Sequence, residues 1–303
     1  MDLQALKLLV QVVEAGGVAK AASLLGMPQS QVSRQILELE RRYGGQLLHR
    51  TGRGVTLSEL GRMVYPQVLQ LLADADRLEL ALRDASGVAM GEVGIGILSS
   101  FVEPMAVPLY GELRRALPQV RLKIFDGSSG QLEEWLATGK IDIGMVVRNQ
   151  GARGADWVLH DAVVLHLIGA PGDRLLQRAD IGVREMAGLP LILPGQPSGI
   201  RPLLDDAARQ AGVQLRVELE TDCFWTQLHL AMSGRLYTIL GPYAFHSAMQ
   251  QGRLGAARIV DPMIKRSIGV SMTNTRPASL ASREASRVLR RCIEDVTLRT
   301  IGL

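Results

Sequence analysis

The chain has 303 residues, of which 47% are hydrophobic and 21% charged, a composition typical of a globular protein with two or more domains. The sequence has no apolar run of about 18 residues and no secretory leader pattern, so we expect a cytoplasmic protein without a membrane partner. Cys223 and Cys292 are too few for a disulfide framework or a zinc cluster, and we expect both thiols to be buried.

The net charge of +4 is unevenly distributed along the chain. Residues 1–58 contain seven Lys/Arg against four Asp/Glu, so this short segment carries +3 of the total. A basic N-terminal segment favours a polyanionic partner such as a nucleic acid.

The first predicted helix begins after Asp2, which can cap it, and ends at Gly16. Its expected buried stripe consists of Leu3, Leu6, Leu9, Val10 and Val13. A short second helix over 18–25 carries Ala21 and Ala22, whose small side chains let another helix cross closely, and Gly26 makes the next turn. This order of elements is typical of a helix-turn-helix.

The third predicted helix runs from Pro28 to Tyr43. Apolar side chains recur at i, i+4, i+7 and i+11 and should form its buried stripe: Val32, Ile36, Leu39 and Tyr43. Hydroxyl, amide and guanidinium groups share the outward face or the first turn: Gln29, Ser30, Gln31, Ser33 and Arg34. Such groups reach base edges and phosphates in a major groove, so this helix is the predicted DNA-reading element.

Two short strands follow the third helix. The segment 46–57 reads QLLHRTGRGVTL, which predicts a hairpin around a glycine turn with Arg53 at its tip. Arg53 and Arg50 can then contact a phosphate or the minor groove, as the wing of a winged helix does.

A long helix is predicted from Ser58, its N-cap, to about Asp84, with a kink expected at Pro66. Apolar residues spaced alternately by four and three form a heptad seam: Val64, Val68, Leu71, Ala75, Leu78 and Leu82. A seam of this length needs a partner, so we expect a second copy of this helix and hence a dimer. The alternative is that the seam packs against another part of the same chain.

Beyond a flexible hinge at 86–91, strands and helices alternate at the spacing of parallel α/β units. The predicted strands are Val93–Leu98, Val120–Phe125, Ile141–Val147, Val163–Ile168, Leu189–Leu193, Leu215–Leu219, Tyr237–Leu240 and Ser267–Met272. The predicted helices include one ending at Leu117, one over Gln131–Thr138 and a closing one over Arg283–Val296.

In an open α/β sheet, ligands bind beyond the carboxyl ends of the strands, where helix N-termini present free N–H groups. Polar residues follow the predicted strands there, and they form the candidate ligand site: Ser99, Ser100, Phe101, Ser128, Ser129, Gln196, Ser198 and Gly199, with Arg148 and Thr221 as weaker members. Converging hydroxyl and amide groups suit a small organic anion, most simply a carboxylate.

Catalytic motifs and metal-ligand spacings are not found in the sequence. There is no G-x-S-x-G, G-x-G-x-x-G, P-loop or H-E-x-x-H pattern, and the five histidines are scattered. We therefore expect no enzymatic activity, no metal and no cofactor.

Residues 1–60 and the glycine that follows them resemble the winged helix-turn-helix of LysR-type transcriptional regulators. The resemblance rests on the alanine pair Ala21-Ala22, the Ser/Gln-rich helix, Leu39-Glu40, Leu47-Leu48-His49-Arg50, Arg53 and Leu57-Ser58-Glu59-Leu60-Gly61. Three positions depart from that pattern: Gly17 stands where serine is usual, Leu48 where phenylalanine is, and Leu60 where alanine is.

The resemblance covers essentially the whole chain and implies three parts. These are a winged helix-turn-helix over 1–58, a dimerising linker helix and hinge over 59–87, and an α/β effector domain over 88–303. The last resembles a two-lobed periplasmic-binding-protein-like fold, with lobe I at about 88–160 and 267–303 and lobe II at about 161–266.

A LysR-type regulator implies several partners. They are double-stranded DNA with dyad symmetry, a small-molecule effector held between the lobes, a second or further copies of the chain in a dimer or tetramer, and RNA polymerase. Two alternatives stay open at this stage. The chain could be a redox sensor that uses Cys223 and Cys292, or a solute-binding α/β protein with a helical arm.

Overall fold

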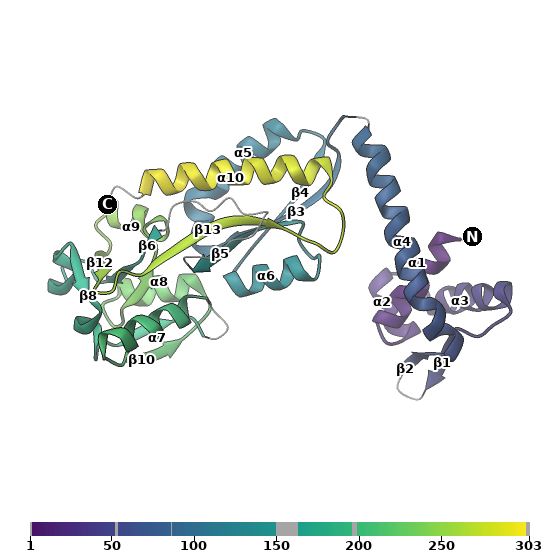
Figure 1. Ribbon diagram of the computed structural model, residues 1–303, viewed down its shortest axis with the longest axis horizontal. Coiled ribbons are helices and arrows are strands. Elements are labelled where there is room, and N and C mark those ends of the chain that lie inside the picture. The colour runs from purple at the N-terminus through teal and green to yellow at the C-terminus, as the bar shows by residue number, and fades with distance from the viewer. Residues whose placement is uncertain (1, 52–53, 86, 150–162, 196–198, 301–303) are drawn as a thin grey trace. The chain divides into compact units, whose positions relative to one another are not determined.

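The computed structural model describes residues 2–51, 54–85, 87–149, 163–195 and 199–300 (Figure 1). The side chains of residues 50, 76–77, 79–81, 83–85 and 148–149 lie outside this description. The chain forms two compact units, Met1–Ser86 and Gly87–Leu303.

The first unit is a small helical bundle with a β-hairpin. Its elements are α1 (Leu3–Glu14), α2 (Val18–Leu25), α3 (Gln29–Tyr43), β1 (Leu48–Thr51), β2 (Gly54–Leu57) and α4 (Glu59–Ala85). The predicted caps are confirmed, since Asp2 accepts the N–H groups of Gln4 and Ala5 and the hydroxyl of Ser58 accepts that of Gly61. The helix α4 continues through Pro66.

The buried side of α1 differs from the predicted stripe. Leu6, Leu8, Leu9 and Val12 are buried, Leu3 is exposed, and Val10 and Val13 are only partly buried. The reason is that α1 contacts α2, α3 and α4, so the bundle covers it from more than one side. Ala21 and Ala22 are buried as predicted, at the crossing of α2 with its neighbours.

The hairpin is fixed to the turn between α1 and α2. The N–H of Val55 donates to the carbonyl oxygen of Gly16 at 3.1 Å. Gly54 has a φ of +139°, and a Cβ added to it would lie 2.1 Å from the same oxygen, so only glycine fits there. This anchor holds the hairpin against the bundle.

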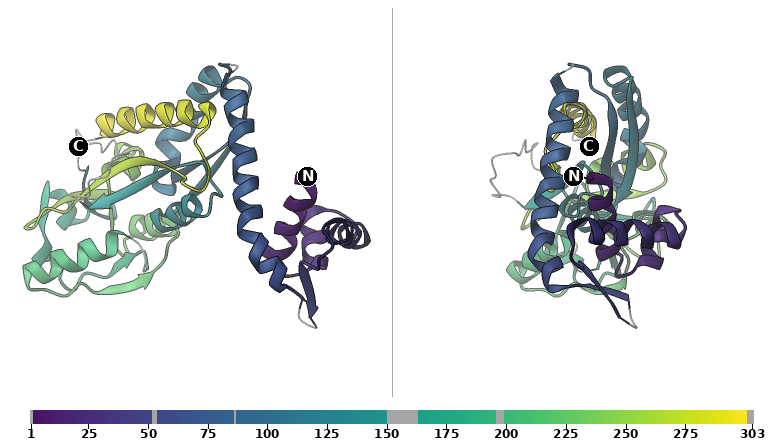
Figure 2. Two further views of the ribbon diagram at one scale, coloured as in Figure 1. Left: turned by 45° about the vertical axis from the view of Figure 1, so that its right-hand side comes forward. Right: turned by 90° about the vertical axis from the view of Figure 1, so that its right-hand side faces the viewer.

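The second unit contains two lobes. The first has a five-stranded sheet in the order β4-β3-β5-β13-β6, in which β13 runs antiparallel to β5 and β6. Its strands are β3 (Gly91–Leu98), β4 (Val120–Gly127), β5 (Ile143–Asn149), β6 (Val163–Val164) and β13 (Lys265–Met272). As Figures 1 and 2 show, α5 (Val102–Ala116) and α10 (Leu280–Thr300) cover one face of this sheet, and α6 (Ser129–Ala137) covers the other. The short turn η1 (Ser99–Phe101) joins β3 to α5.

The second lobe has a four-stranded sheet in the order β11-β7-β12-β8 and a parallel pair, β9 and β10. Its strands are β7 (His166–Gly169), β8 (Asp180–Gly182), β9 (Leu191–Leu193), β10 (Val217–Glu220), β11 (Thr238–Leu240) and β12 (Gly255–Val260). Its helices are η2 (Arg174–Gln177), η3 (Val183–Met186), α7 (Ile200–Ala211), α8 (Phe224–Met232), η4 (Pro242–Ala244) and α9 (His246–Gln250).

The α/β class is as predicted, but three details were wrong. The sheets are mixed rather than parallel, since β7 pairs antiparallel with both β11 and β12. The predicted strand Val163–Ile168 is two strands in different sheets, β6 and β7. The strands β8 and β12 were missed, because β8 has three residues and β12 begins with glycine and two alanines, which have low β-propensity.

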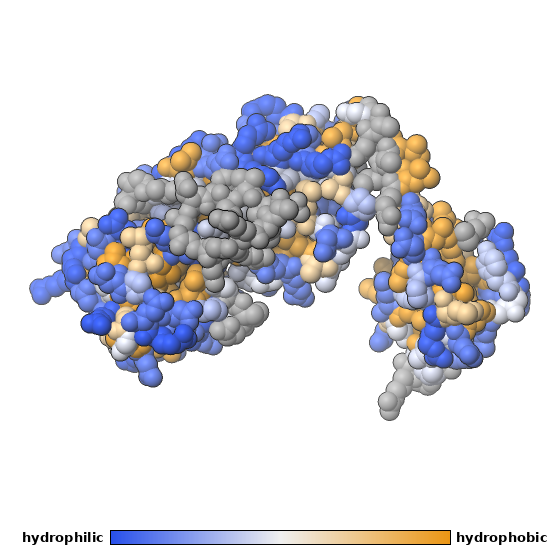
Figure 3. Space-filling view, in the orientation of Figure 1, coloured by the Kyte–Doolittle hydropathy of each residue, from blue (hydrophilic) through white to orange (hydrophobic). Residues whose placement is uncertain are grey.

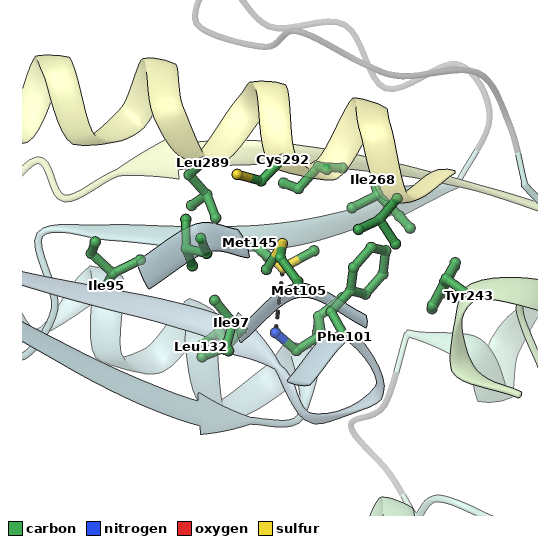
Figure 4. Packing of buried hydrophobic residues seen from close by; sticks show 14 of the residues in the cluster. Ile95, Ile97, Phe101, Met105, Leu132, Met145, Tyr243, Ile268, Leu289 and Cys292 are labelled. Atoms are coloured by element: carbon green, nitrogen blue, oxygen red, sulfur yellow. Dashed lines mark hydrogen bonds between the residues drawn. The ribbon is translucent and has the colours of Figure 1, made fainter. Parts of the chain in front are cut away.

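The core of the first lobe lies between the five-stranded sheet and the helices on its faces. Figure 4 shows Ile95 and Ile97 from β3, Leu132 from α6 and Leu289 from α10 pointing into it. The N–H of Leu98, at the end of β3, donates to the sulfur of Met145 at 3.5 Å. The second lobe has its own apolar cluster, which includes Leu167, Ile181, Leu193 and Leu204. Each lobe thus has its own packed core, which fixes the positions of its strand ends.

Within the described parts of the chain, no single helix is long and apolar enough to cross a membrane. The pair α1 and α2 reaches the required length and composition only together, across a bend of 115°.

Candidate functional site

The helix α3 presents the outward face predicted from the sequence. Val32, Ile36 and Leu39 are buried against the bundle, and burial of each contributes about 1.5–3 kcal/mol to holding the helix in place. The side chains on the other side remain open to solvent: Gln29, Ser30, Gln31 and Arg34 are exposed, and Ser33 is half-buried. Tyr43, predicted as buried, is 54% exposed because it lies in the last turn, where α3 ends at the left-handed Gly44.

Arg34 lies beside Glu38, one turn further along α3. Its Nε is 3.6 Å from a carboxylate oxygen of Glu38, and the two side chains are 76% and 62% exposed. An ion pair at such exposure contributes about 0.3–0.5 kcal/mol. Arg34 can therefore exchange this partner for a phosphate or a base edge at little cost.

The hairpin places Arg50 on the strand β1, opposite Val55 of β2. The side chain of Arg50 lies outside the described residues, as does all of Arg53, so their predicted contacts with DNA stay predictions. Figure 2 shows the β1–β2 hairpin projecting from the bundle formed by α1, α2 and α3. The first unit thus combines a polar-faced helix and a projecting hairpin.

The heptad seam of α4 divides into two halves. Val68 is buried in the core of the first unit, and Val64 and Leu71 are packed against that core. Val68 is therefore covered by its own chain, which corrects the prediction for that position, while the pairing roles of Val64 and Leu71 stay predictions. In the second half, Leu78 and Leu82 are 62% and 68% exposed, and Ala75 is half-buried. Apolar surface is visible along this part of the first unit (Figure 3).

A pocket of about 100 Å³ opens between the carboxyl ends of the strands in the two lobes of the second unit. The first lobe contributes residues after β3 and β4, and the second contributes residues around α8, β11 and η4. Its lining consists of Leu98, Ser99, Ser100, Gly127, Ser128, Ser129, Val147, Pro194, Ile200, Asp222, Phe224, Gln227, Ile239, Leu240, Gly241, Tyr243, Ala244 and Arg266.

The serines of the first lobe sit at helix N-termini. Ser128 caps α6 in a reciprocal arrangement with Gln131, which leaves the first N–H groups of α6 directed outward. The hydroxyl of Ser99 donates to Asp126 at 3.0 Å. The positive end of the α6 dipole at the pocket favours a bound negative charge.

Arg266 lies on β13, the strand that leads back from the second lobe to the first. Its Nε is fully buried and has no hydrogen-bond partner among the described residues. Burial lowers the pKa of this guanidinium, although the nearby Tyr243 partly offsets that effect. Burial also raises the pKa of Tyr243, so its hydroxyl is neutral. An unpaired buried guanidinium is costly, and an anion in the pocket would compensate it.

The structure brings together only part of the predicted ligand site. Ser99, Ser100, Ser128 and Ser129 line the pocket. Phe101 and Thr221 do not line it: Phe101 is fully buried in the core, and Thr221 forms hydrogen bonds with the backbone of Leu193 and Cys223. Gly199 also lies outside the lining, but a Cβ added to it would be 3.8 Å from the Arg266 guanidinium. Gln196, Ser198 and the Arg148 side chain lie outside the described residues.

Sequence reasoning missed Arg266, Tyr243, Asp222 and Gln227. Arg266 lies inside a strand, and the other three residues lie in or near helices. Nothing in the local sequence pattern distinguishes these four residues from structural ones. Only the pairing of β13 with β5, more than 100 residues earlier in the chain, places Arg266 at the pocket.

The two cysteines differ in their surroundings. Cys292 is buried in α10, where burial raises the pKa of its thiol, so the reactive thiolate is disfavoured. Cys223 is exposed and precedes α8, which corrects the prediction that its thiol is buried. Hydrogen bonds from Thr226 lower the pKa of the Cys223 thiol. Both thiols are free.

Within the described ranges, no three His, Cys, Asp or Glu side chains are arranged to hold a metal ion.

Comparisons with known proteins agree with this arrangement. Residues 3–62 match the family model described as "Bacterial regulatory helix-turn-helix protein, lysR family", and residues 86–293 match "LysR substrate binding domain". The nitrogen assimilation regulatory protein nac of Klebsiella aerogenes is 25% identical over 308 residues, covering 100% of both chains. The transcriptional regulator BbuR of Bordetella bronchiseptica is 25% identical and covers 86% of this chain and 80% of its own.

Solved structures of full-length regulators share the fold. A full-length OxyR variant from Pseudomonas aeruginosa has a TM-score of 0.63 at 18% identity, covering 97% of each chain. CbnR complexed with its target DNA has a TM-score of 0.55 at 22% identity, covering 99% of this chain and 100% of its own. Since the two family models together match residues 3–62 and 86–293, the chain belongs to the LysR family of DNA-binding transcriptional regulators with an effector-binding domain.

Proposed function

We propose that the pocket between the two lobes binds a small organic anion, most simply a carboxylate, and that this binding changes how the regulator acts on DNA. The observation that carries the proposal is the buried Nε of Arg266, which has no hydrogen-bond partner among the described residues, in a pocket that the N-terminus of α6 also lines. A ligand anion would pair with the guanidinium and accept N–H groups from the helix.

Residues 1–58 would bind double-stranded DNA. In this proposal α3 enters the major groove, and its exposed polar side chains reach base edges and phosphates: Gln29, Ser30, Gln31, Ser33 and Arg34. Arg50 and Arg53 of the hairpin would contact the DNA backbone or the minor groove.

Residues 59–87 would pair two copies of the chain. The exposed Leu78 and Leu82 on α4 support this role, since large apolar side chains at heptad spacing are stabilised by a matching helix. A dimer, or a tetramer of two dimers, would place two α3 helices along a dyad-symmetric site. Transcription would then change through RNA polymerase at the adjacent promoter.

Residues 88–303 would couple the binding of the ligand to the binding of DNA. A ligand that contacts both lobes favours the conformation in which they are closest, and its differential affinity sets the size of the response. The pocket meets that requirement, because Ser128 lies on the first lobe and Asp222 on the second.

The proposal is tested by thermal unfolding of the full chain with propionate. Binding to the folded state raises its stability by about 2.7 kcal/mol at a ligand concentration of 100 Kd. Arg266→Gln should abolish this response, whereas Lys265→Gln should keep it, since adjacent residues on a strand point to opposite faces. An equal response of the wild type and Arg266→Gln would overturn the anion site.

A further inference from the structure

The pocket is lined by two side chains of opposite charge that form no ion pair with any described residue. Arg266 has no partner for its buried Nε, as described above. Asp222 lies in the segment that leads into α8, is exposed, and also lines the pocket. Within the described ranges, its carboxylate forms no ion pair, either with Arg266 or with another basic side chain.

The neutral polar groups of the pocket are largely occupied by other partners. The amide of Gln227 donates to the carbonyl oxygen of Thr221 at 2.8 Å and accepts from the hydroxyl of Thr238 at 3.3 Å. The hydroxyl of Ser99 donates to Asp126. The charges on Arg266 and Asp222 are therefore the groups of the pocket that remain open to a charged ligand.

The pocket is also small. Its volume is about 100 Å³. This is below the volume of about 150 Å³ of an engineered cavity that binds benzene, so ligands of a few non-hydrogen atoms, such as glycine and alanine, are the natural probes.

We propose that the effector is a small zwitterionic amino acid, whose carboxylate pairs with Arg266 and whose ammonium group pairs with Asp222. This inference rests on the proposed function, because it names the chemistry of the ligand in that same pocket. The hydroxyl of Tyr243 lines the same pocket and supplies a further donor for the carboxylate.

Charge complementarity would also favour a zwitterion over related molecules, which would bind more weakly. A simple monocarboxylate leaves Asp222 without a partner, and a dicarboxylate brings a second negative charge toward it. An amine without a carboxylate leaves Arg266 uncompensated. Specificity of this kind comes from penalties on the wrong ligand as well as from contacts with the right one.

The test is isothermal titration of the full chain with glycine, L-alanine, propionate and L-alaninamide. We expect at least one of the two amino acids to bind about tenfold or more tightly than propionate, and L-alaninamide to bind weakly or not at all. Asp222→Asn should bring the Kd of that amino acid to within about threefold of the propionate value. Asp206→Asn, which removes an exposed carboxylate on α7 away from the pocket, should retain the wild-type preference.

The possible results separate this inference from the proposed function. Propionate binding as tightly as glycine and L-alanine in the wild type, or an unchanged preference in Asp222→Asn, overturns the zwitterion while leaving the anion site intact. Failure of propionate and of both amino acids to bind overturns both. The exposure of Asp222 makes its replacement compatible with folding, so a loss of preference reports on the ligand.

Discussion

The ring of Phe101 stacks against the ring of Tyr243, with 4.0 Å between their centroids and 30° between their planes (Figure 4). Phe101 follows β3 of the first lobe, whereas Tyr243 lies in η4, directly after β11 of the second. The stack joins the two lobes and positions Tyr243, which lines the pocket. The candidate ligand residue Phe101 therefore contacts a pocket residue without lining the pocket itself.

Replacing Phe101 should therefore lower stability and disturb the pocket. Phe101 is fully buried, so Phe101→Ala should reduce the free energy of unfolding by about 3–5 kcal/mol in urea denaturation. Tyr110→Ala, at a position that is 57% exposed on α5, should change it by less than about 0.5 kcal/mol. Equal effects of the two variants would contradict the structural role of the stack.

The unpaired charge of Arg266 should cost stability in the absence of ligand. Removing a buried donor without a partner relieves a penalty of about 1–3 kcal/mol. Arg266→Met should therefore unfold at a higher temperature than the ligand-free wild type, as measured by scanning calorimetry. A lower unfolding temperature for Arg266→Met would mean that the guanidinium has a stabilising partner.

The two halves of α4 should respond differently to substitution. Leu78→Asp, at an exposed position, should weaken self-association in sedimentation velocity and leave the fold of the first unit intact. Leu72→Asp places a charge in the core of that unit and should unfold it, seen as a loss of helical circular dichroism. A Leu78→Asp protein with unchanged self-association would remove α4 as the pairing surface.

Much of the first unit could be predicted because its signals are local. The Asp2 cap, the small pair on α2, the glycine turns and the spacing of Val32, Ile36 and Leu39 each depend on residues a few positions apart. The error at α4 has the opposite cause. A heptad pattern shows that Val68 has to be covered, but it does not show that the covering residues come from the same chain.

The pocket could be predicted only in part for a similar reason. Ser99 and Ser128 directly follow strands, so a general rule for α/β sheets finds them. Arg266 and Asp222 reach the pocket through the pairing of β13 and the placement of α8, which depend on contacts between distant segments. The short strands β8 and β12 were missed because neither contains enough residues with high β-propensity to be recognised alone.

The buried His166 should make the second lobe sensitive to acid. Burial lowers the pKa of its imidazole, which lies near Arg258 and Asp180, so the folded chain holds the ring neutral. The unfolded chain binds a proton at a pKa of about 6.5, and stability is therefore lost as the pH falls below that value.

Urea denaturation at pH 7.5 and 5.5 measures this effect. The free energy of unfolding should decrease less between pH 7.5 and pH 5.5 in His166→Gln than in the wild type. In His229→Gln, at an exposed site, the decrease should equal that of the wild type. An identical pH dependence in all three proteins would exclude His166 as the cause.

The most direct test of the account is binding of duplex DNA by the outward face of α3. Duplexes selected from a random pool by the wild type would be titrated by fluorescence anisotropy at several salt concentrations, with Arg34→Ala and the matched variant Arg115→Ala, on α5 of the other unit. The account predicts that wild-type affinity falls as salt rises and that Arg34→Ala binds about tenfold or more weakly, while Arg115→Ala binds as the wild type does. Salt-independent binding, or an unchanged affinity in Arg34→Ala, would contradict it.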